Sequence, residues 1–207
     1  MSLKLSYTLL APIYDSIVTG PIDAYRIKSL SRIKDTSNKQ ILINGIGSGL
    51  DIPYLADDAC YIGTDITPAM LDRAKKRAQK HATATDRRMN ISFQLADSQA
   101  LPFADNSFDA VIMHLILAVV PSPELALQEA CRVLKPCGKI YIFDKFLRTG
   151  QYAIGRRLLN ILLRHIATRT DVIFEKVLSN CPQLVIIHDE PALANGWFRL
   201  IELNKNN

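Results

Sequence analysis

The amino-acid sequence predicts an α/β fold in which helices cover both faces of a mostly parallel sheet. Seven short apolar runs recur along the 207 residues, and segments of helical periodicity separate most of them. Strands that alternate with helices form βαβ units, which place helices on both faces of a parallel sheet. The runs are Gln40–Asn44, Tyr61–Thr64, Ile91–Leu95, Phe108–Met113, Lys139–Phe143, Leu184–His188 and Trp197–Leu203.

The predicted helices begin at residues that favour a helix start. Thr67 can cap an N-terminus and Pro68 suits the first helical position, so we expect a helix over Thr67–His81. Pro21 gives a similar start to a helix over Pro21–Lys34, which carries apolar residues at helical spacing. The other predicted helices are Glu124–Leu134, Gln151–Ala167 and Asp171–Ser179.

Neither a linker nor an internal repeat interrupts this alternation. We therefore expect a single domain over residues 1–207, a size that is ordinary for one domain. Residues 1–20 carry apolar side chains without a strand pattern, which favours a helical cap over residues 1–35. The sheet and its helices would then occupy residues 36–207.

The composition is that of a globular protein, with 48% hydrophobic and 22% charged residues, and it excludes a disordered chain. The longest apolar stretch, Ala110–Val120, contains His114 and is far shorter than the roughly 20 residues that cross a bilayer. Asp15 and Asp23 interrupt the N-terminal segment, so we expect no signal peptide.

The four cysteines, at positions 60, 131, 137 and 181, form no Cys-x-x-Cys pair and have no histidine cluster near them. This spacing predicts free thiols in a reducing compartment and no metal site. We therefore expect a cytoplasmic protein.

Three glycines alternate directly after the first predicted strand, at Gly45, Gly47 and Gly49. Glycines let the backbone turn sharply and let a ligand approach the peptide planes closely. We expect a helix to follow this loop and to offer its free N–H groups to a negative group. A dinucleotide site would need its third glycine at position 50, where the chain has Leu50.

Two carboxylates follow the next two predicted strands. Asp65 ends the second strand, 20 residues after Gly45, where a carboxylate can accept both hydroxyls of a ribose. Asp97 follows the third strand, and its carboxylate can accept an exocyclic amine. The loop and both carboxylates therefore predict a site for a nucleoside-bearing ligand.

Four motifs in this order resemble those of the class I S-adenosylmethionine-dependent methyltransferases, over Gln40–Phe143. They are the glycine loop, Gly63-Thr-Asp-Ile-Thr-Pro-Ala-Met-Leu71, Asp97–Phe103 with Phe108-Asp-Ala-Val111, and Arg132-Val-Leu-Lys-Pro-Cys-Gly138. The resemblance implies a Rossmann-like, seven-stranded sheet with its last strand antiparallel, and S-adenosylmethionine as cofactor.

The resemblance also assigns roles around the cofactor. Gly45, Gly47 and Gly49 would line the methionine portion, and Asp65 would hold the ribose. The adenine would lie between Ile66 and Met70, with its amino group on Asp97 and Ser98. The sequence departs from the family at Ile43, where the usual acid helps to hold the methionine ammonium, and at Cys137, which replaces a turn glycine.

Methyl transfer is an in-line displacement, so alignment and exclusion of water can supply most of the catalysis. An ammonium acceptor must still lose a proton, and His114 follows the fourth strand at the edge where ligands bind. Tyr14, in the predicted cap, belongs to a Tyr-Asp element that resembles methyltransferases of quinones and of phosphatidylethanolamine. His114 and Tyr14 are therefore the candidate catalytic residues.

The stretch Tyr14–Pro21 and the ending Ala194–Leu200 resemble the soluble bacterial phosphatidylethanolamine N-methyltransferases, which implies a lipid amine as acceptor. Quinone and other small-molecule methyltransferases are the alternative, because they share the cap and the string Leu101-Pro-Phe103. A cofactor-binding protein without transferase activity is a third reading, suggested by Ile43.

The net charge of +5 is uneven, because Arg73–Arg88 is rich in Lys and Arg, which indicates a solvated helix face or an anionic partner. Nucleic acid is disfavoured, since no Asn-Pro-Pro-Tyr type motif follows the fourth strand. The helix over Gln151–Ala167 spreads its apolar residues over a wide arc beside arginines, which suits peripheral contact with an anionic inner-membrane surface.

Overall fold

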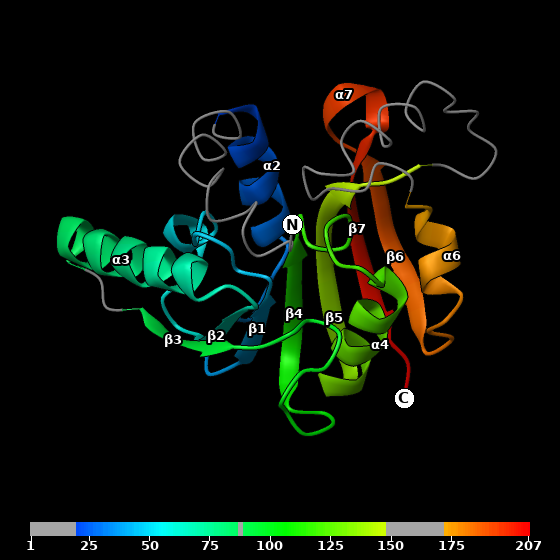
Figure 1. The fold of residues 1–207 in the computed structure, drawn as a ribbon, viewed down its shortest axis with the longest axis horizontal. Helices are drawn as coiled ribbons and strands as arrows, with labels where there is room; N and C mark the ends of the chain where they lie inside the picture. Colours follow the sequence, from blue (N-terminus) through cyan, green and yellow to red (C-terminus); the bar gives the residue numbers. More distant parts are fainter. Residues whose placement is uncertain (1–19, 87–88, 148–171) are drawn as a thin grey trace.

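The computed structural model describes residues 20–86, 89–147 and 172–207 as an α/β fold (Figure 1). One seven-stranded sheet has the order β3-β2-β1-β4-β5-β7-β6. Its strands are β1 Gln40–Asn44, β2 Cys60–Asp65, β3 Asn90–Leu95, β4 Phe108–His114, β5 Leu134–Lys145, β6 Leu184–Pro191 and β7 Phe198–Lys205. All neighbours pair in parallel except β7, which is antiparallel to both β5 and β6. The prediction of a mostly parallel sheet with an antiparallel last strand is confirmed.

Helices lie on both faces of this sheet, as the alternation predicts (Figure 1). One face carries α2, the short 3₁₀ helix η1 and α3, and the other carries α4 and α6. Their bounds are α2 Pro21–Leu30, η1 Ile52–Tyr54, α3 Pro68–Thr85, α4 Pro123–Val133 and α6 Phe174–Leu178; a short α7, Leu193–Gly196, precedes β7. The helix expected over 151–167 and the cap residues 1–19 lie outside the described residues.

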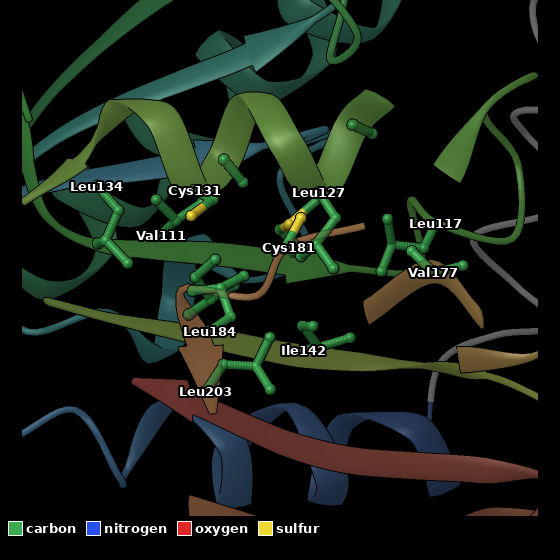
Figure 2. Packing of buried hydrophobic residues seen from close by; sticks show 14 of the residues in the cluster. Val111, Leu117, Leu127, Cys131, Leu134, Ile142, Val177, Cys181, Leu184 and Leu203 are labelled. Atoms are coloured by element: carbon green, nitrogen blue, oxygen red, sulfur yellow. The ribbon is translucent and has the colours of Figure 1, made fainter. Parts of the chain in front are cut away.

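Two apolar clusters fill the space between sheet and helices. In Figure 2, Leu127 and Cys131 of α4 and Val177 of α6 pack over Ile142 of β5 and Leu203 of β7. On the other face, strand residues meet α2 and α3 in a second cluster, which contains Ile41, Ile43, Ile112, Leu30, Leu71 and Ala74. Burial of apolar area on both faces holds the carboxyl ends of the strands in fixed positions.

The glycine loop is not followed by the expected helix but by the single turn of η1. Ten residues, Leu50–Ala59, connect the loop to β2. To start β2 parallel to β1, this connection must run back over the whole length of the five-residue strand β1. A helix covers only about 1.5 Å of that length per residue, whereas a strand covers about 3.3 Å per residue. A helix in so short a connection could not span that distance together with its turns, so the chain makes one turn and then returns as irregular backbone.

Residues 135–138, where Cys137 replaces the family's turn glycine, form a bulge within β5 rather than a break before it. Phe108 pairs with Leu134, and Ala110 pairs with Lys139. Residues 135–138 of β5 therefore lie opposite Asp109 alone. Cys137 lies in the left-handed region at φ 60° and is exposed. That conformation explains why a glycine suits the position.

Candidate functional site

The glycine loop leaves the carboxyl end of β1 with all three glycines at positive φ. A Cβ added at Gly49 would lie 3.0 Å from the Cα of Ala74, so the loop packs directly on α3. A Cβ added at Gly47 (φ 55°) would meet nothing within 4 Å. The loop is therefore packed behind Gly49 and open at Gly47, where a ligand can approach the backbone.

Asp65, at the end of β2, ties this loop to the start of α3. Its Oδ2 accepts a hydrogen bond from the Gly47 backbone N–H at 3.0 Å, and its Oδ1 accepts one from the Thr67 N–H at 2.8 Å. Burial raises the pKa of Asp65, and the two backbone bonds offset only part of that rise. The structure thus places this carboxylate against the loop, and its role toward a ribose stays a prediction.

The residues predicted to surround the adenine lie at the ends of the neighbouring strands β2 and β3. Asp97 follows β3 and accepts hydrogen bonds at Oδ1 from the backbone N–H (2.9 Å) and side chain (3.1 Å) of Gln99. Ser98 is buried and Met70 is half-buried at the start of α3. Ile66 leaves 44% of its surface exposed, which is unusual for so apolar a side chain. Their roles toward the cofactor stay predictions.

His114, at the end of β4, is buried with both ring nitrogens engaged. Nδ1 lies 2.9 Å from Asp51 Oδ1, and Nε2 lies 2.9 Å from Ser29 Oγ of α2. In this arrangement neither nitrogen is open to an acceptor molecule, and the side chain is only 1% exposed. Its role as a base stays a prediction, and Tyr14 lies outside the described residues.

Sequence reasoning missed Asp51 and Ser29, which contact His114, and Arg26, which contacts Asp51. The Arg26 Nη1 donates to Asp51 Oδ1 at 2.7 Å, and both residues are buried. Burial alone would raise the pKa of Asp51, but the charges of His114 and Arg26 hold it far below its usual range. One signal was available in the sequence. Arg26 lies four residues after Ile22 and four before Leu30, on the apolar stripe of its helix, where a charge indicates a buried partner.

Asp144, at the end of β5, is a second buried carboxylate at this edge of the sheet. It is 1% exposed and accepts hydrogen bonds from the backbone N–H groups of Ala118 (3.0 Å) and Lys145 (2.8 Å). Burial raises its pKa to about 6 in spite of these bonds. The native state therefore binds a proton here more tightly than the unfolded chain does.

We expect Asp144 to make stability fall as the pH rises. Between its unfolded pKa near 4 and its folded pKa of about 6, the native state holds the extra proton, so the free energy of unfolding decreases with increasing pH. The loss from pH 4 to pH 7 should be about 2 kcal/mol relative to Asp144→Asn. Urea denaturation at several pH values measures it, with Asp72→Asn, at an exposed carboxylate, as control. Parallel stability curves for the wild type and Asp144→Asn would contradict the expectation.

Among the described residues, no helix is long and apolar enough to cross a membrane. The described residues also contain no group of three or more His, Cys, Asp or Glu side chains that could hold a metal ion.

Comparison with solved structures gives the same fold. The [4+2]-cyclase SpnF is similar with a TM-score of 0.76 at 17% identity, over 99% of this chain and 95% of that one. A putative methyltransferase of Haloferax volcanii, solved with the Trm112 methyltransferase activator, is similar with a TM-score of 0.75 at 18% identity, over 100% and 98% of the two chains. At such identities these likenesses concern the fold alone.

Comparison of sequences finds methyltransferases among the relatives of this chain. A phosphatidylethanolamine N-methyltransferase of Cereibacter sphaeroides is 25% identical over 167 residues, 80% of each chain. A ubiquinone/menaquinone C-methyltransferase of Rickettsia felis is 31% identical over 158 residues, 68% of this chain and 64% of that one. A demethylmenaquinone methyltransferase of Symbiobacterium thermophilum is 33% identical over 119 residues, 55% of this chain and 46% of that one.

Residues 42–142, from β1 into β5, match the family described as a methyltransferase domain. This range contains the glycine loop, Asp65, Asp97 and His114. The chain therefore belongs to the class I S-adenosylmethionine-dependent methyltransferases, and its cofactor is S-adenosylmethionine.

Proposed function

We propose that this protein transfers methyl groups from S-adenosylmethionine to a lipid amine such as phosphatidylethanolamine. The observation that carries the proposal is the alignment with the Cereibacter sphaeroides enzyme, which spans 80% of both chains. The alignments with the quinone methyltransferases of Rickettsia felis and Symbiobacterium thermophilum span 64% and 46% of those proteins.

The loop and strand ends fit the cofactor. The open space over Gly47 would let the cofactor approach the backbone of the loop. Asp65 is half-buried beside that space, and its carboxylate can accept hydrogen bonds from the ribose hydroxyls. Ile66 and Met70 would flank the adenine, and Asp97 with Ser98 would bind its amino group. When bound, the cofactor supplies an electrophilic methyl group on a positively charged sulfur.

The acceptor side would use the residues above this loop. An amine attacks as its free base, and the methylated product must give up a proton. His114 would take that proton at Nε2 if this atom exchanges its bond to Ser29 Oγ for one to the acceptor. By the resemblance, the cap that contains Tyr14 would close over the cofactor.

The decisive experiment offers the protein methyl-labelled cofactor and vesicles that contain phosphatidylethanolamine and phosphatidylglycerol. We expect mass spectrometry to find the label in phosphatidylethanolamine as one added CH₂ per methyl group. His114→Gln should slow turnover about 100-fold or more, because it removes the group that takes the proton. The same protein with a demethylated quinone extract is the matched comparison. Label in the quinone and none in the lipid would replace the lipid proposal by the quinone alternative.

The same vesicles test contact with an anionic membrane. Lys75, Lys76 and Lys80 are exposed on α3, and each basic side chain near an anionic surface should add about 1 kcal/mol of binding, weakened by salt. Activity that depends on phosphatidylglycerol and falls with salt would support membrane contact. Cofactor binding without transfer to lipid or quinone would favour a cofactor-binding protein without transferase activity.

A further inference from the structure

Arg26 carries a buried hydrogen-bond donor that the described residues leave unused. Its Nη1 donates to Asp51, whereas its Nε has no hydrogen-bond partner and lies 3.9 Å from an oxygen of Asp23. The whole residue is 5% exposed. An unpaired buried donor is costly, and native proteins rarely keep one without a reason. This donor therefore indicates an acceptor that is not among the described residues.

The position of the pair connects this donor to the cofactor loop. Asp51 is the second residue after Gly49, so its place is set by the loop itself. Asp51 contacts His114 of β4. Ile112 of β4 pairs with Ile43 of β1, so the same register places His114 beside Gly45, two residues further along both strands. A buried cation and a buried carboxylate thus stand beside the loop where β1 and β4 end.

The neighbouring strand offers no charge for this purpose. Ile43 is 1% exposed and packs in the apolar cluster beneath α2 and α3. His114 lies on the same sheet face as Ile43 and Ile112, because alternate residues of a strand share a face. Asp51 and Arg26 therefore supply, from beyond the strand end, the charges that β1 lacks.

We propose that Arg26 and Asp51 bind the amino-acid end of S-adenosylmethionine, which carries a carboxylate and an ammonium on the same carbon. Arg26 Nε donates to that carboxylate, and the charge of Asp51 favours the ammonium. Both bonds within the network reach Asp51 Oδ1, so Oδ2 takes no part in them. His114 is a positioning residue here, because its Nδ1 holds Asp51 while Ser29 holds its Nε2. The inference rests on the cofactor site proposed above.

Two ligands separate recognition of the amino-acid end from the fold of the site. S-adenosylhomocysteine and 5′-methylthioadenosine share the adenosine and the thioether, but only the first has the amino acid. Arg26→Gln and Asp51→Asn should each weaken S-adenosylhomocysteine about 10- to 100-fold in calorimetry. Both variants should bind 5′-methylthioadenosine within about 2-fold of the wild type, because adenosine contacts are untouched. Arg26→Lys keeps the charge without the Nε donor and should lose part of the affinity.

Arg32→Gln is the matched control, since Arg32 follows the same helix but pairs with Glu190 at 3.1 Å. It should leave both affinities unchanged. The proposal is overturned if Arg26→Gln or Arg26→Lys binds both ligands like the wild type, or loses both in equal proportion, as a purely structural pair would. If the wild type binds neither ligand, the cofactor site itself is wrong. The lipid assay plays no part, so a wrong acceptor leaves this result intact.

Discussion

Replacing Ile43 by glutamate should unfold the protein or lower its melting temperature by about 10 °C or more. The Ile43 side chain is 1% exposed among Ile41, Ile112 and Leu71, in a cluster without a polar partner for a carboxylate. Lost apolar burial and an unpaired buried acid together cost about 4 kcal/mol or more, a large fraction of the stability of a typical domain. Thermal unfolding followed by circular dichroism measures the change.

Ile43→Val is the matched control and should cost only about 1 kcal/mol, because one methylene is removed from the same position. The alternative outcome for Ile43→Glu, tighter cofactor binding, requires a side chain that faces the ligand. A stable variant of Ile43→Glu with raised cofactor affinity would therefore show that position 43 faces the site and not the cluster.

Replacing Asp65 by alanine should raise the dissociation constant of S-adenosylhomocysteine by about 30- to 1,000-fold, or about 2–4 kcal/mol. The change removes charge-assisted bonds to the ribose from a half-buried position. It also leaves the N–H groups of Gly47 and Thr67 without the acceptor that holds the loop to α3. Calorimetry with the purified variant measures the loss.

Asp58→Asn serves as the control for Asp65→Ala, because Asp58 is an exposed carboxylate that bonds Thr36 and Ser37 away from the loop. Its affinity should match that of the wild type. Unchanged affinity in Asp65→Ala would remove Asp65 from the cofactor site.

The sheet could be predicted from the sequence because each strand has a local pattern of apolar residues. Gln40–Asn44 matches β1 at both ends, and Thr67-Pro68 marks the start of α3. The missing helix after the glycine loop could not be seen in the loop itself. It depends on the length of the return path to β2, which is a property of the tertiary structure and not of Gly45–Gly49.

In the candidate site, too, local motifs could be predicted from the sequence, whereas contacts between distant segments could not. Asp65 could be recognised from its place after a strand within a motif, and the fold then shows its contact with Gly47. The network of Arg26, Asp51 and His114 joins three segments far apart in the sequence, so no spacing rule reveals it. His114 was found as a base candidate from its strand end, but its contacts on both ring nitrogens required the fold.

The place of β7 between β5 and β6 has a consequence for synthesis on the ribosome. The strands β1 to β5 can pair as soon as they leave the exit tunnel, whereas β6 emerges before its neighbour in the sheet exists. Until residues 198–205 arrive, the nascent chain carries an open edge on β5 and the unpaired apolar run Val185–Ile187. Such edges pair readily with other chains. Slow translation through the β6 to β7 stretch would therefore prolong the interval in which nascent molecules can associate wrongly.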